Sequence, residues 1–169
     1  MAEKLTPFVV ANRLGRVRFP RSVIVDRKSQ IEPDLMVRPL APLRGWDHAP
    51  VPILVVEVLS KTTQKRDLNE KRDFYMEKGV PEYWVVDRYA RSVIRIGAGE
   101  VETVTSILTW APKNSAATLD IDVAALFAET VAGSAGEVPV FLCRLGAAPS
   151  FLARLGRLIG TTLFEAAIS

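Results

Sequence analysis

The chain has little cysteine, little histidine and no long hydrophobic run, and each shortage excludes a class of protein. Its single cysteine, Cys143, excludes an intramolecular disulfide and a cysteine-rich zinc site, so a reducing cytoplasm is the expected location. No apolar stretch approaches the ~20 residues of a membrane span. The first residues, MAEKLTPF, lack the apolar core of a secretory signal.

Its few potential nucleophiles and bases add little. Cys143 has no recognisable partner for nucleophilic catalysis. His48, the only histidine, lies in the Pro-rich loop RGWDHAPVP, where a solvated loop residue is a simpler interpretation than a general base. Neither a phosphate-cradling glycine loop nor a Ser-His-Asp pattern is present.

Charge is spread unevenly along the 169 residues. Residues 1–78 hold 15 Lys and Arg against 10 Asp and Glu, a net +5, whereas residues 79–169 hold 7 against 9, a net −2. A basic first half is compatible with a polyanionic partner such as nucleic acid, although solvated surface charge would give the same imbalance. The hydrophobic fraction of 49% is that of an ordinary globular domain.

Hydrophobic periodicity and turn residues predict strands, a helix, further strands and a second helix. We expect strands at residues 22–26, 33–37, 53–60, 82–87 and 92–96, and a further strand within residues 100–108. Residues 8–15 read as the end of a helix or as a short strand. The order predicts an α/β or α+β domain around a mixed sheet, over residues 1–133.

Two helices are expected between and after these strands. The first covers residues 68–78, with Asp67 as N-cap, Glu70 as its capping-box partner and Gly79 as the stop. The second covers residues 122–130. Residues 134–169 form a C-terminal extension whose apolar spacing predicts a helix docked on the domain or on a partner.

Glu57 is the most unusual residue, because it interrupts the otherwise apolar run LVVEVL of residues 54–59. Strand alternation places it on one face with Ile53, Val55 and Leu59. A buried carboxylate must be paired, protonated or bound to a metal, since an unpaired one costs several kcal/mol. A structural salt bridge is the simplest explanation.

Two further residues suggest a site. Asp34 begins a short strand that could lie beside the strand of Glu57. Lys71 shares one helical face with Leu68, Phe74 and Tyr75, so it should point inward, unless it snorkels to solvent. Two carboxylates and a lysine suit metal-assisted phosphodiester hydrolysis, with the acids holding Mg²⁺ (or Mn²⁺) and the amine positioning water.

On these residues the chain resembles a known family. The segments IEPDLMV, VVEVLSKTTQKRDLNEKRDFYMEKGVPEYWVVD and LDIDVAALFAE closely resemble the Uma-two family of restriction-endonuclease-like proteins, a branch of the PD-(D/E)XK nuclease superfamily. The resemblance covers about residues 5–130. It implies a restriction-endonuclease-like α/β core with a mixed central sheet flanked by helices.

The same resemblance implies roles for particular residues. Asp34 corresponds to the acid of the PD motif and Glu57 to the acid of the (D/E)XK motif, with the backbone carbonyl of Val58 as a further metal ligand. The third place of that motif is Leu59, so the usual strand lysine is absent and Lys71 is its candidate replacement. Family members also have a longer N-terminal portion, so the first helix is expected to be short or missing here.

Three functions follow as alternatives. The first is a Mg²⁺-dependent endodeoxyribonuclease, in which the residues Lys61, Lys65 and Arg66 contact DNA phosphates. The second is a catalytically inactive nucleic-acid-binding or protein-interaction module on the same fold. The third is a structural homodimer that uses the 82–87 hairpin or the C-terminal helix as its interface.

Overall fold

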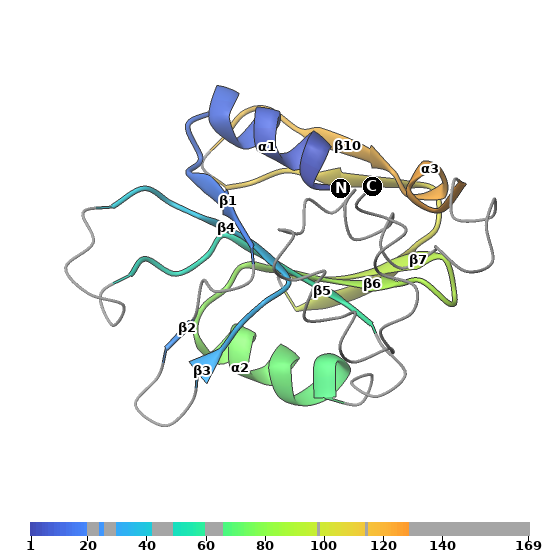
Figure 1. Ribbon diagram of the computed structural model, residues 1–169, viewed down its shortest axis with the longest axis horizontal. Coiled ribbons are helices and arrows are strands. Elements are labelled where there is room, and N and C mark those ends of the chain that lie inside the picture. Colours follow the sequence, from blue (N-terminus) through green and yellow to red (C-terminus); the bar gives the residue numbers. More distant parts are fainter. Residues whose placement is uncertain are drawn as a thin grey trace, which may run out of the picture.

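A computed structural model describes residues 1–19, 24–25, 30–41, 49–59, 66–97, 99–113 and 115–128. Its centre is a six-stranded mixed sheet in the order β1-β4-β5-β6-β7-β8 (Figure 1). These strands are Arg16–Arg18, Leu35–Arg38, Leu54–Val58, Glu82–Asp87, Ser92–Gly97 and Glu100–Val104. Only β5 and β6 pair in parallel, and the other neighbours are antiparallel. The expected mixed sheet is therefore confirmed.

Helices and a smaller sheet cover the two faces of the central sheet. On one face lie the ten-residue helix α1 (Ala2–Ala11), the ribbon of β9 (Ile107–Trp110) with β10 (Leu119–Asp122), and α3 (Val123–Ala128). On the other lies α2 (Arg72–Glu77), preceded by the π-helical turn η2 (Arg66–Lys71), while β2 (Ile24–Val25) pairs with β3 (Gln30–Ile31) at the side (Figure 1). No helix among the described residues is long and apolar enough to cross a membrane.

The sheet separates two hydrophobic clusters. The α1-side cluster includes Leu5, Leu54, Val56 and Trp84, and the α2-side cluster includes Val55, Leu59, Tyr75, Tyr83 and Val85. Alternate residues of β5 thus enter opposite clusters, as the near-continuous Leu and Val of a strand covered on both faces predict. Ile53, which we expected on the face of Glu57, precedes the strand and packs against the α1-side cluster instead.

The helix after β5 differs from the sequence expectation at its start. Helical backbone begins at Arg66, one residue before the proposed N-cap, and its first six residues have π-helical hydrogen bonding. The end is as expected. Gly79 has φ +76°, and the N–H groups of Gly79 and Val80 donate to the carbonyls of Met76 and Tyr75, which is a Schellman motif.

The strand and helix assignments also needed three corrections. The sequence expectation placed one strand in residues 100–108, but β8 joins the central sheet and β9 pairs with β10 in a second sheet. We did not anticipate β1, β3 or β10. The first helix, expected to be short or missing, is the ten-residue α1, whose Leu5 and Val9 are fully buried.

Two local features match the expectations. The β6–β7 turn is closed by the carboxylate of Asp87, which accepts hydrogen bonds from the N–H groups of Tyr89 and Ala90 at 2.8 and 2.9 Å. Helix α3 begins after Asp122, whose side chain accepts a hydrogen bond from the N–H of Ala125 at 2.9 Å. The proposed 134–169 extension lies outside the described residues.

Candidate active site

Glu57 lies near the end of β5, on the face covered by α2, and is only 1% exposed. Strand alternation puts it on the same face as Val55 and Leu59, both members of the α2-side cluster. The chain therefore places a carboxylate inside an apolar layer, where it must find partners.

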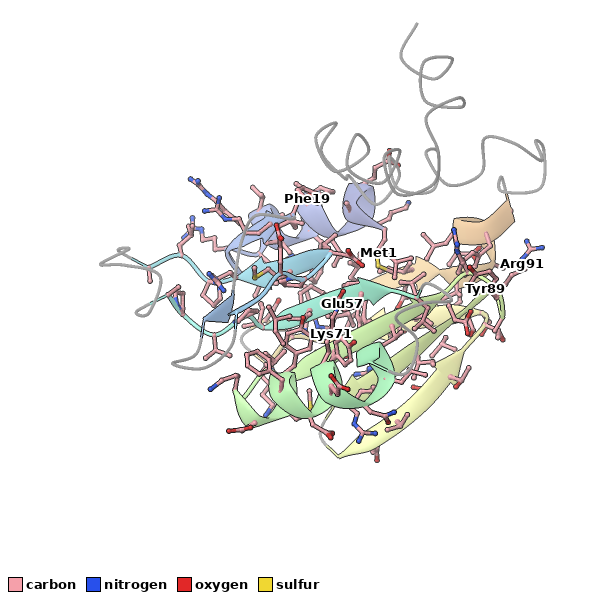
Figure 2. All side chains as sticks on the ribbon, turned by 60° about the horizontal axis from the view of Figure 1, so that its bottom comes forward. Met1, Phe19, Glu57, Lys71, Tyr89 and Arg91 are labelled. Carbon is pink, nitrogen blue, oxygen red and sulfur yellow. The ribbon has the colours of Figure 1, made fainter. Side chains whose placement is uncertain are left out.

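Each oxygen of that carboxylate contacts a donor on the following helix: one forms an ion pair, and the other accepts a hydrogen bond. Lys71 Nζ lies 2.9 Å from Oε2 of Glu57, and the hydroxyl of Tyr75 donates to Oε1 at 2.6 Å. Figure 2 shows Glu57 and Lys71 together between β5 and the helix. The side chain of Lys71 is 14% exposed, so the amine points inward rather than snorkelling to solvent.

Helix geometry explains why these two donors arrive together. Lys71 is the last residue of η2, and Tyr75 follows it by four residues, so both side chains lie on one face. Leu68 and Phe74 pack against the α2-side cluster and fix that face on the sheet. π-helical turns occur frequently at functional sites.

Asp34 reaches the site from the neighbouring strand. It immediately precedes β4, and because β4 runs antiparallel to β5, with Leu35 opposite Val56, the start of β4 lies beside the end of β5. Oδ2 of Asp34 accepts a hydrogen bond from the backbone N–H of Val58 at 2.8 Å. Asp34, Glu57 and Lys71 thus come from three successive elements to one end of the sheet.

The electrostatics of the site follow from burial and like charge. Burial, and then the nearby carboxylate of Asp34, raise the pKa of Glu57 to about 8, against the opposing effects of Lys71 and Tyr75. Burial also raises the pKa of Tyr75, as does the adjacent Glu57, so the phenol stays a hydrogen-bond donor. A cation at this position would relieve the repulsion between the two acids.

The donor set fits a hard divalent cation. Two carboxylates supply oxygen ligands, and Mg²⁺ typically binds one or two carboxylates while keeping several waters. The described residues contain no group of three or more His, Cys, Asp or Glu side chains arranged for a metal. Water and substrate oxygens would therefore have to complete the coordination, which is the usual arrangement for Mg²⁺ at phosphate-transfer sites.

Several residues predicted from the sequence cannot be placed. Lys61, Lys65 and His48 lie outside the described residues, and for Arg66 only the backbone, at the start of η2, is described. The carbonyl of Val58 as a ligand stays a prediction, although the N–H of the same residue binds Asp34.

Sequence reasoning missed the role of Tyr75. It was interpreted as one of the large residues that pack the helix onto the sheet, which it also is, since it is fully buried. Its hydroxyl nevertheless needs a partner when buried. The available signal was its position four residues after Lys71, on a face that covers Glu57.

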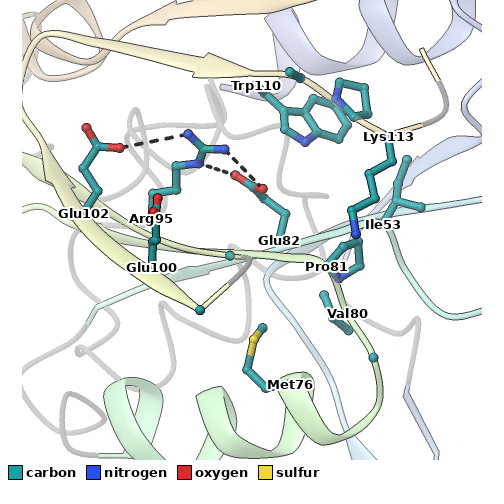
Figure 3. Close-up of a pocket in the computed structure, with 15 residues that line it drawn as sticks. Ile53, Met76, Val80, Pro81, Glu82, Arg95, Glu100, Glu102, Trp110 and Lys113 are labelled. Carbon is teal, nitrogen blue, oxygen red and sulfur yellow. Dashed lines mark hydrogen bonds and ion pairs between the residues drawn. The ribbon is translucent and has the colours of Figure 1, made fainter.

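A second polar cluster lies at the opposite end of β6, beside a cavity of about 640 Å³ (Figure 3). There Glu82 accepts hydrogen bonds from the indole of Trp84, at 2.9 Å, and from Arg95, which also lies 4.0 Å from Glu102. These charged groups satisfy one another, so the cluster is explained as a structural link between β6, β7 and β8. None of the three candidate catalytic residues lines this cavity.

Comparison with known proteins gives a matching family and several similar solved structures. Among solved structures, the chain is similar to the crystal structure of a "putative nuclease belonging to DUF820" from Anabaena variabilis, with a TM-score of 0.61, 14% identity and 75% of each chain covered. At that identity the likeness shows the fold alone. None of the curated proteins matches the chain.

The family match is independent of that structural likeness. The Uma2 family model, described as "Putative restriction endonuclease", matches residues 1–119, which include α1, the whole central sheet and the site at Glu57. The match therefore spans every element that brings Asp34, Glu57 and Lys71 together. The chain belongs to the Uma2 family of restriction-endonuclease-like proteins.

Proposed function

We propose that the chain is a Mg²⁺-dependent endonuclease that hydrolyses phosphodiester bonds of DNA. The observation that carries the proposal is the convergence on Glu57: a buried carboxylate with Lys71 Nζ at 2.9 Å and the Asp34 carboxylate fixed to the next backbone amide. A structural salt bridge would need only Glu57 and Lys71. The second acid, Asp34, repels Glu57, so its presence beside Glu57 is better explained by a cation that both carboxylates bind.

In this proposal Asp34 and Glu57 hold the metal, with the carbonyl of Val58 as a further ligand. The bound ion would polarise the phosphoryl oxygen and lower the pKa of a coordinated water. The backbone N–H of Val58 orients the Asp34 carboxylate, and the hydroxyl of Tyr75 orients that of Glu57. Both acids are therefore fixed before substrate arrives, which favours catalysis by preorganisation.

Lys71 supplies the positive charge that the strand position lacks, since that position is Leu59. Its ammonium group lies within hydrogen-bond distance of Glu57, so it can also donate to a phosphate oxygen or to a water held at that carboxylate. In that position it would stabilise the negative charge that develops on the phosphoryl group in the transition state. Leu59 itself is buried and apolar, so Lys71 on the helix has no counterpart amine at this strand position.

Cleavage of supercoiled plasmid and of labelled oligonucleotides, with Mg²⁺, Mn²⁺ or EDTA, tests the proposal. We expect D34N and E57Q to lose activity at least ~100-fold, and K71M to lose it by ~10²–10³-fold, the range seen on removal of one transition-state donor. D73N, which removes an exposed acid of the same helix, is the matched control and should cleave like wild type. Equal cleavage by all variants would indicate a contaminating nuclease and end the proposal.

The alternative is an inactive nucleic-acid-binding or protein-interaction module on the same fold. Leu59 in place of a lysine favours it, as does the engagement of both Glu57 oxygens by Lys71 and Tyr75. Calorimetric titration with Mg²⁺ and Mn²⁺ separates the two functions. Metal binding that is lost in D34N and E57Q favours the nuclease, and absence of binding favours the module.

A further inference from the structure

Three arginines lie on the same face of the sheet as Glu57, at its β1 edge. In the register of β1 with β4, Arg16 is opposite Arg38 and Arg18 is opposite Met36. Residues directly opposite each other in antiparallel strands share a face. Met36 in turn lies opposite Val55 and belongs to the α2-side cluster, so this row of arginines lies on the face that carries Glu57.

Two segments that contribute to this edge, residues 4–19 and 35–41, carry charge of one sign. Described residues 4–19 and 35–41 contain Lys4, Arg13, Arg16, Arg18 and Arg38 but no Asp or Glu. Arg16 and Arg18 are exposed, whereas Arg38 is 8% exposed. The pKa of Arg38 is lowered by burial and then by the charge of Arg18, so these two guanidinium groups repel each other. A polyanion bound by the exposed Arg16 and Arg18 would offset the charge of Arg18.

The spacing of the strands places the arginines within reach of a substrate strand. Arg18, Met36 and Val55 form one row across β1, β4 and β5, and Glu57 is two residues beyond Val55. With strands ~4.8 Å apart and a rise of ~3.3 Å per residue, the Cα atoms of Arg18 and Glu57 are ~12 Å apart. For a duplex whose axis runs along the line from Arg18 to Glu57, one strand advances ~3.4 Å per phosphate, so this separation corresponds to three or four phosphates.

We propose that Arg16 and Arg18 on the edge strand β1, beside Arg38 on β4, bind the phosphate backbone of a nucleic-acid duplex a few phosphates away from the site at Glu57. This inference rests on the proposed function, because it identifies where the same substrate is held. Arginine suits the role because its planar guanidinium donates two parallel hydrogen bonds to a phosphate. The contact carries no base information, so it would position duplexes of any sequence.

Duplex binding by the full chain, measured by fluorescence anisotropy with a labelled 20-base-pair DNA in EDTA, tests the inference. We expect R16A/R18A to bind roughly tenfold more weakly. The slope of log K against log salt should also fall by about 1.8, because each phosphate contact contributes ~0.9. R16K/R18K should keep the salt slope. R88A/K113A, which removes the same net charge from the β6–β7 turn and from the loop after β9, should bind like wild type.

Three results would overturn the inference: no duplex binding by wild type, equal binding by R16A/R18A and wild type, or displacement of the duplex as readily by polyglutamate as by unlabelled DNA. Thermal unfolding of each variant shows whether it is folded. A different result would remove the proposed function without removing this inference. Salt-dependent binding that is lost in R16A/R18A, together with no cleavage under any metal condition, would uphold this surface and remove the nuclease.

Discussion

At the scale of single residues, the hydroxyl of Tyr75 holds the buried carboxylate of Glu57 by a hydrogen bond of 2.6 Å. Tyr75→Phe keeps the ring in the α2-side cluster but leaves one oxygen of Glu57 without this donor. At pH ~9, where Glu57 is ionised, we expect a loss of ~1.5–3 kcal/mol in the free energy of unfolding, and at pH ~7, where it is protonated, a smaller loss of ~0.5–1.5 kcal/mol. Urea unfolding measures it, and Tyr89→Phe, at an exposed tyrosine, should change stability little. Equal effects would show that Glu57 does not depend on Tyr75.

Glu57 should also make stability depend on pH. Its pKa is about 8 in the folded chain, compared with 4.5 in its ordinary state, so the folded chain binds an additional proton between these values. The stabilisation is complete below pH ~4.5 and is lost as pH rises through ~8, at about 1.4 kcal/mol per pKa unit.

Glu57→Gln should abolish this pH dependence. Relative to the variant, wild type should lose on the order of 4 kcal/mol of unfolding free energy between pH 4.5 and 9 in EDTA. Urea titrations across that range measure it, with the exposed Glu100→Gln as a control that keeps the wild-type slope. A wild-type curve parallel to that of Glu57→Gln would show that Glu57 is ionised throughout.

The sequence predicts part of this site for a definite reason. Glu57 stands out because a carboxylate interrupts an apolar run, and Lys71 stands out because it shares a helical face with apolar residues. Those are local patterns. The bond from Val58 N–H to Asp34 and the bond from Tyr75 to Glu57 join residues 24 and 18 positions apart, and their geometry depends on how strand and helix pack. No periodicity encodes that geometry.

At the scale of elements, two glycines with positive φ end α2 and connect α1 to β1. Gly79 has φ +76° and open space where a Cβ would lie, whereas a Cβ on Gly15, at φ +140°, would lie 2.1 Å from the carbonyl oxygen of Arg38. Gly79→Ala should therefore cost only the ~1–2 kcal/mol of a left-handed residue. Gly15→Ala adds a clash with backbone and should cost more, roughly 3 kcal/mol or above.

Thermal unfolding of the two variants side by side checks this difference. They carry the same chemical change, so the contrast reports the contact of residue 15 with β4 together with its different φ. Similar losses would mean that the α1–β1 connection can move away from Arg38. In that case the edge strand that carries Arg16 and Arg18 would be less firmly placed than the register indicates.

The elements differ in how well the sequence predicted them. Strand β5 was predicted because a near-continuous apolar run is a local signal, and the helix at α2 because an apolar helical face and a glycine stop are local signals too. The small sheet of β9 and β10 was missed because its strands give no sign of their partner. Leu108 and Trp110 alternate with exposed residues, and any half-buried strand shows this alternation, whichever strand it pairs with. The three-residue β1 is too short to show a period.

At the scale of the whole molecule, burial is concentrated in the centre of the sheet. The first four residues of β5 and the first five of β6 are buried, whereas the first four residues of the edge strand β8 are exposed. Hydrogen exchange followed by NMR should find the slowest amides in β5 and β6, at Val55 and Val85, and much faster exchange in β8, at Glu102. Comparable protection in all three strands would contradict this distribution of stability.

The bond between Asp34 and the backbone of Val58 has a genetic consequence. Because the donor is a main-chain amide, nineteen of the twenty amino acids can supply it, and proline alone cannot. In a saturation library screened for function, position 58 should tolerate many residues of similar bulk, whereas proline should be absent from the functional variants. Position 34 should tolerate almost nothing. The side chain at position 58, although it lies at the centre of the site, would then be among the least constrained in the site. Sequence conservation at position 58 would therefore reveal little about the importance of that residue.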